Sequence, residues 1–279
     1  MKIRVRKAAA CMALAVVFLL SALFGRVPNA FAVGFSYSNY QQFLDKYVVS
    51  GKYIGDMNLN VVNYDAIQKD KEKPGSLYDK VLQQFADFDP NGIEGREDQI
   101  AFWINAYNIG AIKMIMDYYP VDSIRSTTIH WLKNPWNKKI LTVGNTKYRL
   151  GQIEHDILLD KYGEPLVHFA IVCASLSCPD LSPTVFKGGQ LMEQLERQAR
   201  LFLGNEKKGL RIDRENGVVH FAMIFKFDKK SFPNGAKDAI SLITRFIANE
   251  KDREYLRSGP YESKYLGYNW DLNTLSKAR

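Results

Sequence analysis

Apolar residues recur every three or four positions along most of this chain, which is the spacing of amphipathic helices. This spacing predicts helices over residues 36–49, 74–88, 189–203 and 237–248. A longer segment, residues 96–118, is apolar on nearly every side, and a helix without a polar face is usually buried all round. We therefore expect this segment to form the centre of the core.

Shorter signals lie between these segments. Two hairpins are predicted, one around Gly144-Asn145 and the other around Asn216-Gly217, because apolar runs flank each turn. The β-branched run Val167 to Val172 predicts a buried strand, and residues 150–159 predict a short helix. Helices mixed with hairpins in this way indicate an α+β fold, a single domain of helices packed on a small, mostly antiparallel sheet.

The two ends of this domain carry weaker signals. Residues 33–54 are interpreted as an N-terminal helix and linker, and residues 51–60 as a turn-rich connection. Residues 55–275 form the main domain, and its aromatic-rich end, residues 261–273, is expected to pack back on the core.

The first 32 residues have the features of a secretory signal peptide. Four basic residues precede an apolar stretch over residues 8–24, and Ala30-Phe31-Ala32 supplies a small-x-small cleavage site. We expect cleavage and export to the periplasm or the extracellular space. The alternative is an uncleaved N-terminus, which would be the protein's one means of membrane attachment.

Charge excludes a nucleic-acid role. Residues 1–32 hold five of the 38 basic residues and none of the 30 acidic ones, so the remainder carries 33 basic and 30 acidic residues, a net of +3. No lysine or arginine tract stands out, and we therefore infer no nucleic-acid partner.

The run from His168 to Pro179 carries the strongest candidate chemistry. Cys178 follows the predicted strand, and Pro179 suits the first position of a helix, where a thiol can be activated. Cys173 lies five residues upstream, so a Cys173–Cys178 disulfide is an equal alternative in an exported protein. His168, on an apolar strand, is interpreted as a core histidine rather than a base.

Polar residues on two apolar helices could complete a cysteine site. Glu154 falls on the apolar face of its helix and needs a partner, and His155 lies at the margin of that face. Asn105 and Asn108, three residues apart, point to neighbouring parts of one surface. Taken alone, each of these residues is more simply explained by structural hydrogen bonds.

No cofactor or metal is expected. The histidines show no helix-spaced pair, and the sequence has no Cys-x-x-Cys motif, glycine-rich phosphate loop or dinucleotide fingerprint.

Several separated motifs, in this order, resemble the domain-of-unknown-function 547 family. They are Ala101-Phe-Trp-Ile-Asn-Ala-Tyr-Asn108, Ile153-Glu-His155, the stretch from His168-Phe-Ala170 through Ser177-Cys-Pro179, Ile224-Phe-Lys-Phe227 and Tyr268-Asn-Trp-Asp-Leu-Asn273. The resemblance covers about residues 55–275 and implies a bacterial or plant relative of unassigned activity. The function must therefore come from the residues themselves.

Our leading hypothesis is a cysteine-dependent hydrolase or acyl transferase with a papain- or transglutaminase-like core. Cys178 would be the nucleophile, His155 the general base, and Glu154 or Asn105 the group that orients the imidazole. The substrate would be a small molecule, a peptide or another acyl compound. The alternative is a non-enzymatic envelope binding or scaffold domain braced by a Cys173–Cys178 disulfide. A thiol–disulfide redox role ranks third, because the spacing is not Cys-x-x-Cys.

Overall fold

The computed structural model describes residues 34–279, so the signal peptide predicted over residues 1–32 lies outside the described residues. The α-helices of this part are α2 (Ser38–Tyr47), α3 (Tyr64–Lys71), α4 (Leu77–Asp87), α5 (Arg96–Met116), α6 (Leu191–Leu203), α7 (Ile224–Phe227), α8 (Ala236–Ile243) and α9 (Glu250–Ser258). The strands are β1 (Val48–Ile54), β2 (Met57–Val62), β3 (Lys139–Val143), β4 (Thr146–Arg149), β5 (Leu210–Asp213), β6 (Val218–Phe221) and β7 (Glu262–Tyr265). A π-helix occupies Gln152–Lys161, and a 3-10 helix occupies Pro165–Phe169.

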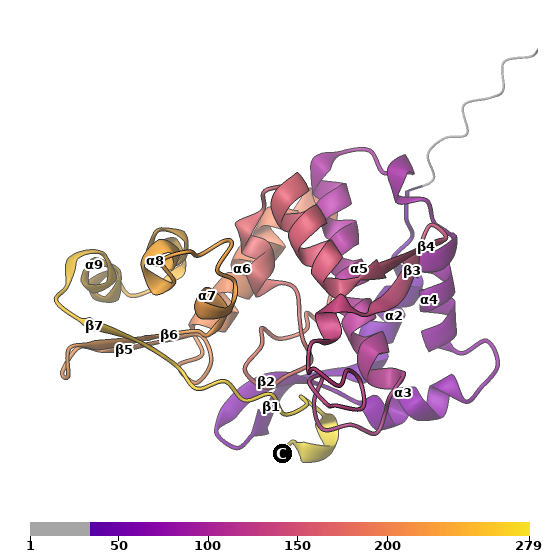
Figure 1. Cartoon of the computed structure of the whole chain (residues 1–279), viewed down its shortest axis with the longest axis horizontal. Coiled ribbons are helices and arrows are strands. Elements are labelled where there is room, and N and C mark those ends of the chain that lie inside the picture. The colour runs from indigo at the N-terminus through magenta and orange to yellow at the C-terminus, as the bar shows by residue number, and fades with distance from the viewer. Residues whose placement is uncertain (1–33) are drawn as a thin grey trace, which may run out of the picture. The chain divides into compact units, whose positions relative to one another are not determined.

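The strands of the described chain form three small sheets, so the α+β class is confirmed but the single sheet is not. β1 pairs with β2 and β3 with β4, both antiparallel, and β5 and β6 form a third antiparallel hairpin. β7 joins the third sheet parallel to β6 (Figure 1). The predicted connection over residues 51–60 is itself part of the first hairpin, with Gly51 and Gly55 at positive φ.

α5 lies at the centre of the core, as its pattern predicts. From Ile100 to Met116 every residue except Lys113 is buried. β3 packs on this helix and on α4, and a Cβ at Gly110 would lie 3.1 Å from Cδ2 of Leu150 and 3.5 Å from Cβ of Leu141. The missing side chain at Gly110 therefore allows α5 and the β3–β4 hairpin to approach closely.

Two buried amides on α5 hold backbone from other parts of the chain. Asn105 donates to the carbonyl of Phe186 at 2.8 Å and accepts from its N–H at 3.0 Å. Asn108 donates to the carbonyl of Ala170 and accepts from the N–H of Val172, both at 3.0 Å. Each amide therefore supplies one hydrogen-bond donor and one acceptor to buried backbone, as a neighbouring strand would in a sheet.

The strand predicted over Val167–Val172 does not form. Residues up to Phe169 are a 3-10 helix, residues 170–174 are irregular, and Ala174 has a φ of 58°, a left-handed conformation unusual for alanine. The Asn108 amide satisfies the backbone here, so the segment stays buried without a strand partner. The predicted return of the C-terminal tail is confirmed, since Asn273 donates to the Ala174 carbonyl and Leu176 to the Asp271 carbonyl, both at 3.0 Å.

Replacing Asn108 tests this amide. We expect Asn108→Ala to lower the free energy of unfolding by about 2–4 kcal/mol, because the Ala170 carbonyl and the Val172 N–H would be buried without partners. Urea denaturation measures the change. Gln83→Ala, on the exposed side of α4, should change it by no more than about 0.5 kcal/mol. An equally small change for Asn108→Ala would contradict the role given to the amide.

Candidate active site

One cavity of about 750 Å³ gathers most of the predicted site residues. Cys173 and Cys178 line it, together with Glu154 and His155 from the π-helix. Asn105 does not line it, because both atoms of its amide are bound to Phe186. Three of the four predicted catalytic residues therefore share one cavity, and the fourth lies elsewhere on α5.

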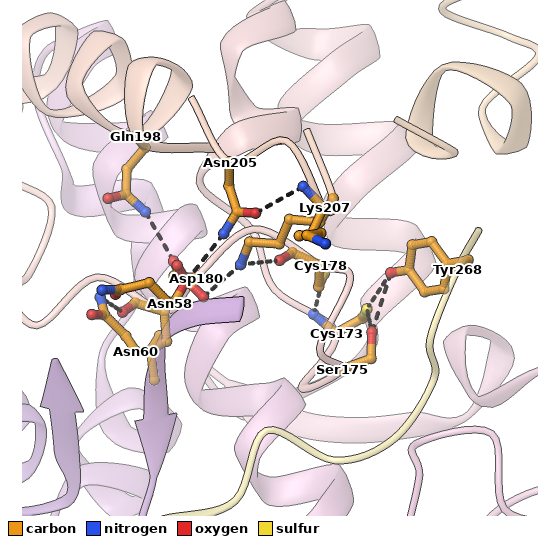
Figure 2. Close-up of polar contacts among 12 residues, drawn as sticks. Asn58, Asn60, Cys173, Ser175, Cys178, Asp180, Gln198, Asn205, Lys207 and Tyr268 are labelled. Carbon is orange, nitrogen blue, oxygen red and sulfur yellow. Dashed lines mark hydrogen bonds and ion pairs between the residues drawn. The ribbon is translucent and has the colours of Figure 1, made fainter. Parts of the chain in front are cut away.

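Both described cysteines are free thiols, and hydrogen bonds connect them to each other and to two hydroxyl groups. The N–H of Cys173 donates to Sγ of Cys178 at 2.9 Å. Sγ of Cys173 lies 2.9 Å from the hydroxyl oxygen of Ser175 and 3.1 Å from that of Tyr268. Figure 2 shows both hydroxyl groups directed at this sulfur. Cys173 therefore has two O–H donors that could stabilise a thiolate.

The two thiols differ in acidity. Burial raises the pKa of Cys173, but hydrogen bonds from the Cys178 thiol and from the Ser175 and Tyr268 hydroxyls outweigh burial and bring the pKa below its usual range. Burial and the adjacent Cys173 sulfur hold the pKa of Cys178 well above its usual range. Burial and the same sulfur also raise the pKa of Tyr268, which therefore stays protonated and able to donate. The hydroxyl groups beside Sγ of Cys173 therefore favour a thiolate on Cys173 over one on Cys178.

The prediction that Pro179 begins a helix is wrong. Residues 179–187 are irregular, and the next helical turn starts at Gly188. A helix with Pro179 at its first position would need the N–H of residue 183 to bond the Pro179 carbonyl, and Pro183 has no N–H. Cys178 therefore has no helix N-terminus to lower its pKa, and its own N–H donates to the Ser175 carbonyl at 3.2 Å.

A buried lysine fixes the Cys178 loop instead. Nζ of Lys208, only 2% exposed, donates to the Cys178 carbonyl at 3.0 Å and to Oδ1 of Asp180 at 2.7 Å. The amide of Gln198 donates to the Asp180 carbonyl at 2.9 Å (Figure 2). Burial raises the pKa of Asp180, while the Lys208 ammonium lowers it. The ion pair between Lys208 and Asp180 thus holds the loop that carries Cys178, and each charged group would lack a counter-charge without the other.

Glu154 and His155 reach the cavity from consecutive positions of the π-helix. Its hydrogen bonds span five residues, as from the N–H of Tyr162 to the Ile157 carbonyl at 3.1 Å, so each residue rotates less than in an α-helix. The Tyr107 hydroxyl donates to Oε2 of Glu154 at 3.1 Å and accepts from Nε1 of Trp136 at 3.0 Å. Glu154 is therefore held by Tyr107, and burial raises its pKa even though His155 lowers it.

His155 is the one described histidine with an unsatisfied buried ring nitrogen. Its Nδ1 is buried and has no hydrogen-bond partner within residues 34–279. His168 differs, because its Nδ1 lies 2.8 Å from the Pro165 carbonyl and its Nε2 lies 2.8 Å from Oδ2 of Asp228. Both nitrogens of His168 already lie within hydrogen-bond distance of an oxygen atom, so neither is left to accept a hydrogen bond from a thiol. It is a core histidine, as predicted.

The sequence did not identify several residues around the thiols. Its candidates do not include Ser175, Tyr107, Lys208 and Asp228, and Tyr268 enters only as the first residue of the Tyr268–Asn273 motif. Tyr268 and Lys208 lie 95 and 30 residues from their partners Cys173 and Cys178. The one available signal was the tyrosine that opens the Tyr268–Asn273 motif.

Two features are absent from residues 34–279. No group of three or more histidine, cysteine, aspartate or glutamate side chains is arranged to hold a metal ion. Within the same residues, no helix combines the length and apolar character needed to cross a membrane.

Comparison with known proteins identifies one domain. Residues 90–203 match the family described as "Protein of unknown function, DUF547". The matched range runs from the turn before α5 to the end of α6 and includes both thiols, Glu154 and His155. Searches of curated proteins and of solved structures found no match.

Lys208 offers a test of the loop. We expect Lys208→Met to lower the free energy of unfolding by about 3 kcal/mol at pH 7, because Asp180 is left as an unpaired, partly buried carboxylate and the Cys178 carbonyl loses its donor. A carboxyl whose folded pKa is raised costs most above that pKa, so the loss should shrink towards pH 4 as Asp180 takes up a proton. Denaturation at both pH values measures this difference.

Two further variants separate charge from packing. Lys208→Met/Asp180→Asn removes the unpaired carboxylate and should recover part of the loss. Lys207→Met removes an exposed neighbour that pairs with Asp56 and should cost no more than about 1 kcal/mol. A loss for Lys208→Met that is equal at pH 4 and pH 7 would contradict the role of Asp180.

Proposed function

Since this chain is a DUF547 domain-containing protein, and the family description assigns no reaction, we propose from its cavity that it is a cysteine-dependent hydrolase or acyl transferase. One observation carries the proposal: the Cys173 sulfur, with two hydroxyl donors, lines the same cavity as His155, whose Nδ1 has no partner. A stabilised thiolate and an available imidazole are the two groups that thiol acyl transfer requires.

The proposal assigns the nucleophile to Cys173 rather than to Cys178, the residue that the sequence favours. Cys173 has the lowered pKa, and the next residue, Ala174, has a left-handed backbone, a conformation that is costly and concentrated at functional sites. Sγ of Cys178 accepts a hydrogen bond from the Cys173 N–H and so helps to hold the Cys173 backbone in place. Glu154 is already hydrogen-bonded to Tyr107, and the Asn105 amide is already hydrogen-bonded to the backbone of Phe186. Neither is therefore proposed to orient His155.

The reaction proceeds in two steps. The Cys173 thiolate attacks the carbonyl carbon of an ester, thioester or amide, and a C–S bond forms as the bond to the leaving group breaks. The leaving group takes a proton from the His155 imidazolium. His155 then takes a proton from water or an amine, which attacks the thioester and releases the acyl product and the Cys173 thiolate.

We also propose that the protein is exported and that its fold has a particular type of core. The N-terminal pattern supports export, so the thiols would act in an oxidising compartment. A papain- or transglutaminase-like core remains a prediction of this proposal.

A second candidate function uses the same residues without catalysis. The N–H of Cys173 donates to Sγ of Cys178 at 2.9 Å, so the two cysteines are neighbours, and an oxidant of the compartment would join them in a disulfide that braces a binding domain. In that case the melting temperature should fall on reduction.

Substitution of each thiol tests the nucleophile. Cys173→Ser should reduce hydrolysis of 4-nitrophenyl acetate and of a short-chain acyl thioester by about 10³-fold or more, because an unactivated hydroxyl replaces the thiolate. Cys178→Ser should keep measurable activity and an acyl-enzyme that mass spectrometry finds on Cys173. Circular dichroism checks that both variants fold. Full activity in Cys173→Ser, with loss in Cys178→Ser, would return the assignment to Cys178.

The pH dependence tests the role of Tyr268. Tyr268→Phe removes a donor to the Cys173 sulfur, so the pKa of this thiol should rise. The acid limb of the rate–pH profile should therefore move to higher pH, while the rate at high pH changes less. Tyr261→Phe, whose hydroxyl bonds the Leu256 carbonyl outside the cavity, serves as the matched control. An unchanged acid limb in Tyr268→Phe would contradict the role.

A further inference from the structure

Three cations line the same cavity without an ionic partner. Arg125, Lys133 and Lys229 form part of its wall, and none of them makes an ion pair with a carboxylate of residues 34–279. Lys230, on the same wall, pairs with Asp160 at 2.5 Å. The unpaired cations therefore give this wall positive charge that the protein itself does not neutralise.

The acidic groups of the cavity do not cancel this charge. Burial raises the pKa of Asp228, but hydrogen bonds from His168 and Ser231 outweigh burial and lower it, so this carboxylate stays ionised and offsets one of the four positive charges on the wall. Glu154 is bonded to Tyr107. Burial raises the pKa of Glu154, which reduces its tendency to ionise. The charge available to a ligand is thus mainly that of Arg125, Lys133 and Lys229.

Packing connects Arg125 to the thiols. Its guanidinium stacks over Trp270, 4.7 Å from the ring centroid, and its Nε donates to the Lys133 carbonyl at 3.2 Å. The Trp270 ring lies 4.3 Å from that of Tyr268, and the Tyr268 hydroxyl contacts Cys173. A ligand bound to Arg125 would therefore lie along the aromatic side chains that lead to the sulfur.

The space beside Arg125 extends beyond the thiol cavity. A second hollow of about 620 Å³ shares Arg125, Lys133 and Trp270 with the first, and its wall carries the side chains of Ser126 and Thr128. Asp122, also on its wall, lies 3.8 Å from Lys277 and is almost fully exposed. Arg125 thus lies on the wall of both hollows.

We infer that the cavity accepts an acyl compound with a carboxylate or phosphate group, which Arg125, Lys133 and Lys229 bind while the acyl carbonyl lies at Cys173. This inference rests on the proposed function, because it names the substrate class of that reaction. The apolar part of the substrate would pack on Trp270 and its neighbour Trp136, whose ring centroids lie 6.0 Å apart.

Alkylation of the thiol tests the charge selection without any turnover. Iodoacetate and iodoacetamide both form a C–S bond with loss of iodide, and they differ in charge but hardly in size. Relative to free glutathione, the protein should favour iodoacetate about two- to fivefold or more, since each exposed charge pair contributes about that factor. Mass spectrometry locates the label, and added salt should weaken the preference.

Variants connect the preference to the named cations. Lys229→Gln, whose side chain makes no ion pair in the described chain, should reduce the preference, and Arg125→Gln should reduce it further. Arg257→Gln, an exposed residue on α9 outside both hollows, should leave it unchanged. A preference that survives both cavity substitutions, or a preference for iodoacetamide, would overturn the inference.

A second pair of probes separates this inference from the reaction itself. Mono-4-nitrophenyl glutarate should be hydrolysed with a higher kcat/KM than its neutral methyl ester, and Lys229→Gln should narrow the difference. Hydrolysis of both esters without an anionic preference would overturn the anion site and leave the reaction standing. No hydrolysis of either, with the iodoacetate preference intact, would overturn the reaction and support an anion site beside the thiol.

Discussion

The Asn108 amide donates one hydrogen bond to the Ala170 carbonyl and accepts one from the Val172 N–H. These two bonds hold the backbone that leads into Cys173, and the position of both thiols depends on them. Burial and hydrogen bonding contribute differently here. Each large apolar side chain of α5 stabilises the fold by about 1.5–3 kcal/mol, whereas one hydrogen bond contributes about 1 kcal/mol net. Burial therefore drives the collapse around α5, and the amide decides which backbone groups can be buried against it.

This division explains which elements the sequence could predict. α5, the β3–β4 hairpin and the β5–β6 hairpin follow from local periodicity and turn residues, and they occur where predicted. The segment from Val167 to Val172 has the composition of a strand, but its partner is one side chain on α5 rather than another strand. No local pattern reports such a partner, because Asn108 lies 64 residues earlier. The helix expected after Pro179 fails for a local reason, since Pro183 has no N–H to bond the Pro179 carbonyl.

The candidate site divides in the same way. Cys178, Cys173, Glu154 and His155 could be named from residue type, and the structure brings them to one cavity. Their partners come from distant segments: Tyr107 from α5, Tyr268 from the tail and Lys208 from the turn before β5. Asn105 has the right chemistry for an orienting group, but Phe186 occupies both atoms of its amide. Residue type thus identifies candidates, and only tertiary contacts decide which of two neighbouring thiols has the donors.

The central claim is that Cys173 carries the thiolate, because the Ser175 and Tyr268 hydroxyls lie within hydrogen-bond distance of its sulfur and burial holds the pKa of Cys178 high. The most direct measurement is iodoacetamide labelling of the unreduced protein from pH 5 to 9, with each label located by mass spectrometry. The account predicts that Cys173 reacts before Cys178 and that its rate rises with a midpoint below the ordinary thiol pKa of about 8.5. Faster labelling of Cys178, or a bridged pair that takes no label until reduced, would contradict it.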